Sequence, residues 1–372
     1  MLSRRRLVWT LLACTSLSAR GQVPATPLDR PAAAPAVAAD ALMLIVPGPE
    51  TPFARVAEAL REGFIAAHRI KRESVAVQVV ETDASAAQAI SALRGARDRG
   101  VRLAVGPLTR NAVNGVVEHG NAGLPVLLLN VPDPRDSVPA SQLAFGLSVE
   151  DEARVLVQNA LRDLDPGATP TAARRHVIVI GDSGLSRRAG AAFVAALRAA
   201  GQPLITLEYS QYGPDRCAHE IGKAPVTSIF LALNASDAAQ LRARLPIDAP
   251  LYATSQINVA ATEGVLIAND LEGVRFVDMP WLVDPERPIV SAYPRGPADY
   301  DAEMQRLYAF GIDAYRVAVE WLAGRTRFEL DGVTGWLRVD RERGARVERT
   351  PTFAVFREGR VERSDALKEV TR

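Results

Sequence analysis

Short apolar runs alternate with amphipathic stretches from residue 41 onward, and this alternation constrains the fold more than any other feature of the sequence. The first run, 41–46, is continuously apolar and ends at Pro47-Gly48-Pro49, which is typical of a strand buried on both faces and followed by a turn. Further strand-like runs cover 75–80, 101–105 and 125–129, with helical periodicity between them. A repeated strand–helix unit predicts a parallel sheet covered by helices, with right-handed crossovers.

A second series of the same kind begins after residue 147. Its strand-like runs are 176–180, 204–209, 228–233 and 250–254, and its helical stretches include 189–200 and 237–245. Two such series predict an α/β protein with two Rossmann-like lobes, each built on a parallel sheet. Ligands of open α/β sheets bind outside the carboxyl ends of the strands, so two facing edges would form a cleft between the lobes.

The segment 304–323 has the clearest helical periodicity in the chain. Apolar or small residues recur in it every three or four positions, whereas Asp313, Arg316 and Glu320 share the opposite face. Two strand-like segments follow it outside any strand–helix repeat, at 332–340 and 351–361.

These patterns divide the chain into four parts. We expect a signal segment (1–13), an Ala- and Pro-rich tether (14–40), a first lobe (41–147 with 282–326) and a second lobe (148–281 with 327–372). The chain would then cross between the lobes near 145–148, 280–284 and 324–330. A length of 372 residues suits two lobes of this size.

The N-terminus has the pattern of a targeting segment. A basic stretch, 4–6, precedes a short apolar stretch, 7–13, that is too short to span a bilayer. It ends in Leu11-Leu12-Ala13-Cys14, which resembles a bacterial lipobox, so we predict lipidation of Cys14. The alternative is an ordinary secretory signal cut near residue 19 or 21, which would leave the protein soluble in the periplasm.

Composition excludes several classes of function. Lys and Arg total 44 against 43 for Asp and Glu, so the net charge of +1 gives no indication of a nucleic-acid binder. Two cysteines cannot form a disulfide scaffold, and four scattered histidines make a His-rich metal site a poor interpretation. We therefore expect no metal and no nucleic-acid partner.

Catalytic motifs are also missing. The first strand is followed by no Gly-x-Gly-x-x-Gly, and the sequence holds no P-loop and no His-Glu-x-x-His. The segment Gly181-Asp182-Ser183-Gly184 contains a serine between small residues, but it follows a buried strand and opens a helix, so a strand–helix turn explains it better than a nucleophile. We predict a protein that is not an enzyme and uses no cofactor.

Several polar or small residues end a predicted strand or open a predicted helix, where unpaired backbone N–H groups can bind a polar ligand. An amino acid would require a carboxylate site, which Thr109 and Asn111 could supply, and an acidic group for its ammonium, such as Asp182. The candidates for the rim of the interlobe cleft are Gly106, Thr109, Asn130, Asp182, Ser183, Thr254 and Ser255.

Six segments, in this order, resemble the LppC/LpoA family of lipoproteins, the penicillin-binding protein activators. The resemblance covers roughly residues 41–360. The matching segments are Gly106-Pro107-Leu108-Thr109, Phe145–Ala153, Tyr252-Ala253-Thr254-Ser255, Gly273–Trp281, Arg306–Tyr315 and Gly332–Leu337.

This resemblance implies the type I periplasmic-binding-protein fold and an outer-membrane lipoprotein that faces the periplasm. Such a protein binds a bifunctional penicillin-binding protein and stimulates peptidoglycan synthesis, and it touches the membrane only through its lipid anchor. Within this interpretation, Arg275, Asp278 and Trp281 are candidates for the partner-binding surface, because an aromatic residue near an arginine is common in binding hot spots. A packing role for Trp281 is the alternative.

The other function compatible with this fold is that of a substrate-binding protein of an ABC transporter, for an amino acid or another small polar ligand. Fold alone does not distinguish the two, because function depends on the site. A small-molecule ligand in the interlobe cleft would favour transport, and binding of a peptidoglycan synthase would favour activation.

Overall fold

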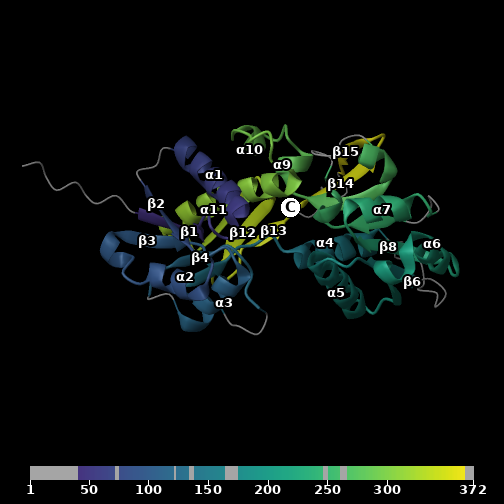
Figure 1. Ribbon diagram of the computed structural model, residues 1–372, viewed down its shortest axis with the longest axis horizontal. Helices are drawn as coiled ribbons and strands as arrows, with labels where there is room; N and C mark the ends of the chain where they lie inside the picture. Colours follow the sequence, from purple (N-terminus) through teal and green to yellow (C-terminus); the bar gives the residue numbers. More distant parts are fainter. Residues whose placement is uncertain are drawn as a thin grey trace, which may run out of the picture. The chain divides into compact units, whose positions relative to one another are not determined.

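Two parallel sheets form the framework of the computed structural model, which describes residues 41–71, 75–120, 123–133, 138–163, 175–245, 250–259 and 266–364 (Figure 1). The predicted signal segment and the whole of the predicted tether, including Cys14, lie outside these residues. The first sheet has the order β2-β1-β3-β4-β5, and neighbouring strands are parallel. Its strands are β1 (Ala41–Pro47), β2 (Ala76–Thr82), β3 (Val101–Val105), β4 (Val126–Leu128) and β5 (Gln142–Ala144).

All seven residues of β1 are buried, as its continuous apolar run predicts. The helices of this part of the chain are α1 (Ala54–Lys71), α2 (Ala86–Leu93), the short 3-10 helix η1 (Arg97–Arg99), α3 (Arg110–His119) and the long α11 (Ala302–Leu322). We call the first sheet with α1, α2, α3 and α11 the first lobe.

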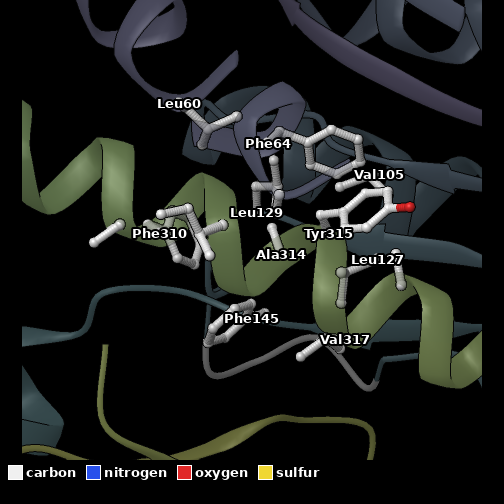
Figure 2. Packing of buried hydrophobic residues seen from close by; sticks show 14 of the residues in the cluster. Leu60, Phe64, Val105, Leu127, Leu129, Phe145, Phe310, Ala314, Tyr315 and Val317 are labelled. Atoms are coloured by element: carbon white, nitrogen blue, oxygen red, sulfur yellow. The ribbon is translucent and has the colours of Figure 1, made fainter. Parts of the chain in front are cut away.

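Helices α1 and α11 pack unusually closely, and Figure 2 shows Leu60 and Phe64 of α1 facing Phe310, Ala314 and Tyr315 of α11. Glycines permit this approach. A Cβ atom on Gly63 would lie 1.8 Å from the carbonyl oxygen of Tyr308, and one on Gly311 would lie 2.0 Å from that of Leu60. Because α11 is also covered by Phe145 and the strands, it is buried on nearly every side.

The second sheet has the order β15-β14-β10-β9-β8-β6-β7. Its parallel strands are β6 (Arg175–Ile180), β7 (Leu204–Glu208), β8 (Val226–Ala232), β9 (Leu251–Ala253) and β10 (Val274–Asp278), and β14 (Thr352–Arg357) and β15 (Arg360–Arg363) add an antiparallel edge. The helices of this part are α4 (Val149–Arg162), α5 (Gly184–Ala199), α6 (Tyr209–Gly222), α7 (Ala235–Arg242) and the 3-10 helix η2 (Ser255–Ile257). We call the second sheet with α4 to α7 the second lobe.

A small antiparallel sheet follows α11 and consists of β11 (Arg327–Asp331), β12 (Trp336–Asp340) and β13 (Glu348–Thr350). Two short helices, α9 (Pro280–Val283) and α10 (Pro288–Ser291), precede α11. We expected everything after residue 326 to belong to the second lobe. That expectation is wrong for 327–350, because Val333, Leu337, Val339 and Val347 pack in the hydrophobic core of the first lobe.

The third crossing therefore lies between β13 and β14 rather than near 324–330. The sequence could not reveal this, because the partner of a half-buried strand is set by contacts far away in the chain. We propose a division in which residues 41–147 and 279–350 form the first lobe, and residues 148–278 and 352–364 form the second.

Candidate functional site

A buried polar junction connects the first and second lobes. It joins five side chains that come from different elements: Glu152 of α4, Asn258 after η2, Asp278 of β10, Arg306 of α11 and Arg349 of β13.

The centre of this junction is an ion pair between Arg306 and Asp278. The Arg306 Nε lies 3.1 Å from Asp278 Oδ1, and Nη2 lies 2.8 Å from Oδ2. Nη2 also donates to the carbonyl oxygens of Ser255, at 2.9 Å, and Asn258, at 2.8 Å. One guanidinium group from the first lobe thus binds two separate segments of the second lobe, the end of β10 and the stretch from Ser255 to Asn258.

The remaining lone pairs of Asp278 are also occupied. The Asn258 Nδ2 donates to Oδ2 at 2.8 Å, and the backbone N–H of Met279 donates to Oδ1 at 2.8 Å. Burial alone would lower the pKa of Arg306, but the Asp278 carboxylate outweighs it and the pKa is raised above the ordinary value. Arg306 therefore stays charged and cannot donate a proton to a ligand.

A second ion pair extends the junction toward β13. Arg349 Nη2 lies 3.0 Å from Glu152 Oε1, and both side chains are only 6% exposed. The other carboxylate oxygen of Glu152 accepts from the backbone N–H of Ser255 at 3.0 Å, and Arg349 Nη1 donates to the carbonyl oxygen of Thr334 at 3.1 Å. Because each charge has a partner, this arrangement favours a fixed contact between lobes over acid–base chemistry.

Asp313, also on α11, stabilises the turn between β11 and β12. Its carboxylate accepts from Arg316 Nη1 at 2.8 Å and from the N–H groups of Val333 and Thr334 at 3.2 and 2.8 Å. The Thr334 hydroxyl donates to it at 2.7 Å. The sequence pattern puts Asp313 and Arg316 on the polar face of this helix. Both are nevertheless buried, because the small antiparallel sheet covers that side of α11.

The first turn of α4 carries a further charged contact. Arg188 of α5 donates to both carboxylate oxygens of Glu150, at 2.7 and 2.9 Å. Partial burial would raise the pKa of Glu150, but the hydrogen bonds from Arg188 prevail and lower it to about 2. This pair fixes α4 against α5 within the second lobe.

The seven cleft candidates fall into two groups. Gly106, Thr109 and Asn130 lie together at the carboxyl edge of the first sheet. Thr109 Oγ1 donates to the carbonyl oxygen of Ala84 at 3.0 Å, and Asn130 Nδ2 donates to that of Leu108 at 3.0 Å. Gly106 is buried at φ +110°, and a Cβ there would lie 2.2 Å from the carbonyl oxygen of Ile45, so only glycine fits.

The other group lies at the carboxyl edge of the second sheet. Ser183 caps α5 by accepting from the N–H of Ser186, and Gln256 links Ser186 to the buried Thr254. Ser255 belongs to the polar junction, and Asp182 is exposed. No hydrogen bond or ion pair within the described residues joins the two groups, so a ligand-binding cleft between them stays a prediction.

Comparison with known proteins identifies the family. The family model described as "LppC putative lipoprotein" matches residues 36–221 and 215–359, which is most of the chain. The chain belongs to the LppC family. This result confirms the resemblance that the sequence motifs indicated.

Curated relatives of this LppC-family chain carry the name penicillin-binding protein activator LpoA. The protein of that name from Mannheimia succiniciproducens is 26% identical over 303 residues, which cover 78% of this chain and 49% of the relative. The chain spans about half the length of the curated relatives it matches.

Solved structures confirm the predicted fold class. The C-domain of LpoA from Haemophilus influenzae, described as a regulator of PBP1A, is 21% identical with a TM-score of 0.70, and the match covers 87% of this chain and 100% of that domain. A protein from Chromobacterium violaceum described as a "putative branched-chain amino acid ABC transporter" is 32% identical with a TM-score of 0.71, and the match covers 85% and 99% of the two chains.

The proposed partner surface of this LppC-family chain needs correction. Asp278 and Trp281 are each only 1% exposed, so the expectation that they lie on the surface is wrong. Asp278 ends β10 and is paired with Arg306. Trp281 packs in the core of the first lobe, where its Nε1 donates to Gln305 Oε1 at 3.0 Å and the Arg295 guanidinium covers its ring. Arg275 is exposed, as expected.

Sequence reasoning missed the junction residues Glu152, Arg306 and Arg349. The sequence patterns assigned no functional role to any of the three. Their spacing in the chain exceeds 150 residues between Glu152 and Arg306, so no local pattern links them. The only available signal was that Glu152 and Arg306 fall within the segments that resemble the family.

The described residues contain no candidate metal centre and no candidate membrane-spanning helix. No group of three or more His, Cys, Asp or Glu side chains in this part of the chain could hold a metal ion. No helix within the same residues is both long enough and apolar enough to cross a membrane.

Proposed function

We propose that this LppC-family protein is a non-enzymatic periplasmic lipoprotein that binds and activates a bifunctional penicillin-binding protein in peptidoglycan synthesis. The observation that carries the proposal is the match to the complete C-domain of a regulator of PBP1A. Curated relatives named as penicillin-binding protein activators support it over about three quarters of the chain.

The polar junction supports action by binding rather than by turnover. Its two ion pairs, Arg306–Asp278 and Arg349–Glu152, are buried and satisfied by additional hydrogen bonds. Ser183, the one serine in a nucleophile-like segment, caps a helix. These side chains hold the two lobes together, so a partner would meet a surface of defined shape, which lowers the entropic cost of binding.

The lipid anchor would complete this function. We propose that Cys14 is lipidated and holds the protein at the outer membrane, with residues 14–40 as the tether. Tethering raises the effective concentration near membrane neighbours, so modest contacts with a synthase would suffice. If Cys14→Ser stays as firmly membrane-bound as the parent in cell fractionation, the anchor proposal is wrong.

The binding step can be tested directly. The full-length chain is immobilised, and the purified bifunctional synthase of the same organism is passed over it, with a monofunctional transpeptidase as the control analyte. Retention of the bifunctional enzyme alone is the expected result. Equal retention of both enzymes, or of neither, contradicts the proposal.

A transport function is the alternative, and one observation favours it. The structure that is 32% identical is described as belonging to a branched-chain amino acid ABC transporter. A ligand would then bind in the interlobe cleft, at residues such as Thr109, Asn130 and Asp182. A thermal shift with leucine, isoleucine or valine, together with no retention of the synthase, would establish this alternative.

A further inference from the structure

A polar cavity lies in the second lobe, at the edge of the sheet where β8, β9 and β10 begin. Its volume is about 500 Å³, which suits a small ligand. The candidates for the interlobe cleft lie at the opposite edge, where the strands end. This cavity is therefore separate from the cleft and from the polar junction.

The Asn159 side chain is the first sign that the cavity binds a ligand. Asn159 lies near the end of α4, is only 3% exposed and lines the cavity. Its side-chain amide forms no hydrogen bond within the described residues and is not sealed off from the cavity, so it can contact a ligand there. An amide offers two donors and one acceptor, so it suits a ligand that is rich in hydrogen-bonding groups.

A charged pair forms one wall of the cavity. Arg275 Nη1 lies 3.0 Å from Asp163 Oδ2 and 3.2 Å from the hydroxyl of Tyr252, and that hydroxyl lies 3.4 Å from the same carboxylate oxygen. The Arg275 guanidinium also lies over the Tyr252 ring, 5.8 Å from its centroid. These contacts hold donors and an acceptor side by side in a fixed arrangement.

Hydroxyl groups line the start of β8. The Ser228 hydroxyl contacts His176 Nδ1 at 2.7 Å, and Thr227 lies beside it. Burial lowers the pKa of His176, so its ring is neutral at physiological pH and adds no charge. Apolar surface from Phe353 and Pro250 completes the lining.

Charge balance identifies the class of ligand. Arg275 is neutralised by Asp163, and Arg357 at the rim pairs with Glu362 at 3.4 Å. A free anion would meet the Asp163 carboxylate, and the two charges of a zwitterionic amino acid would gain little from a pair that already neutralises itself. Neighbouring hydroxyl groups, in contrast, can bridge an intact pair by accepting from the guanidinium and donating to the carboxylate.

We propose that this cavity is a binding site for a neutral saccharide of one or two sugar units. The hydroxyl groups of the sugar would contact Arg275, Asp163 and Asn159, and its apolar face would lie against Phe353. The inference does not depend on the partner of the protein, because it rests on the cavity alone.

Isothermal titration calorimetry of the full-length chain tests the proposal with three probes: maltose, N,N′-diacetylchitobiose and leucine. We expect at least one disaccharide to bind, and Arg275→Gln to weaken that binding by about tenfold or more, the loss expected for a charged hydrogen bond. Arg275 is exposed, so this variant should fold normally. Asn159→Ala, which removes the amide, should weaken binding as well.

The matched control is Arg244→Gln, which breaks another exposed ion pair of the second lobe, with Asp215, away from the cavity. It should bind the disaccharide like the parent. The proposal is overturned if neither disaccharide binds at millimolar concentration, if Arg275→Gln binds like the parent, or if the control loses as much affinity. If leucine binds and its binding depends on Arg275, the ligand of the cavity is an amino acid and the saccharide proposal is wrong.

Discussion

Replacing Arg306 by methionine should destabilise the protein severely, because it leaves the Asp278 carboxylate buried without its counter-charge. The side chain of Asp278 is only 1% exposed and that of Arg306 is 14% exposed. Removing one partner of a buried ion pair costs about 3–5 kcal/mol. The carbonyl oxygens of Ser255 and Asn258 lose a donor too, which places the expected loss in the upper part of that range.

Urea unfolding followed by circular dichroism measures this free energy of unfolding. The control is Arg244→Met, because Arg244 and Asp215 are 38% and 84% exposed and such pairs contribute about 0–1 kcal/mol. The double variant with Asp278→Asn should recover part of the loss, since the buried charge is then gone. Two results would refute the buried Arg306–Asp278 ion pair. One is a loss of unfolding free energy below about 1 kcal/mol for Arg306→Met. The other is a loss in the double variant that equals the sum of the losses in the two single variants.

Three other predictions concern packing, pH dependence and thiol reactivity. Gly63→Ala should cost about 1–3 kcal/mol or more in thermal unfolding, because its Cβ would meet the Tyr308 carbonyl oxygen, whereas Gly184→Ala, with open space around it, should be neutral. Arg188→Gln should lower stability by about 1 kcal/mol near pH 6, a value reduced by solvent screening. Because the pKa of Glu150 is about 2 in the folded protein and 4.5 in the unfolded chain, its ion pair with Arg188 stabilises the fold fully only above pH 4.5. The difference in stability between Arg188→Gln and the parent should therefore vanish as the pH falls through about 2. The Cys217 thiol, whose pKa burial raises to about 11, should resist iodoacetamide near pH 8 in the native protein and react once urea unfolds it.

Each of these predictions has a clear contrary result. Equal stability of the two glycine variants would mean that α1 and α11 do not pack as closely as described. A stability difference for Arg188→Gln that persists at pH 2 would mean that Glu150 is not the group stabilised. Fast labelling of native Cys217 would contradict its burial in the core of the second lobe.

The parallel sheets were predictable because buried strands have continuous apolar runs. The segments 41–46, 101–105 and 176–180 all form strands at or near the expected residues. Helix α6 was missed, because Gly213, at φ +67°, and Pro214 interrupt its periodicity. Strand β5 was missed as well, since three residues give too short a pattern.

The functional residues were harder to predict than the fold. Residues that follow strands, such as Thr254 and Ser255, do lie at a sheet edge, because the topology of parallel sheets puts strand ends there. The partners of Arg306 and Arg349 come from distant segments and appear only when the lobes are assembled. Trp281 shows the opposite error. It was a candidate for the partner surface, with packing as the alternative, and the structure places it in the core.

Glycan polymerisation by the purified bifunctional synthase, measured with and without the full-length chain, tests the central claim most directly. If the protein is an activator, the polymerisation rate rises with the concentration of the chain and saturates, and the chain alone produces no glycan. The destabilised variant Arg306→Met, added at the same concentration, should stimulate less than the Arg244→Met control. An unchanged rate at saturating concentrations of the native chain would contradict the claim.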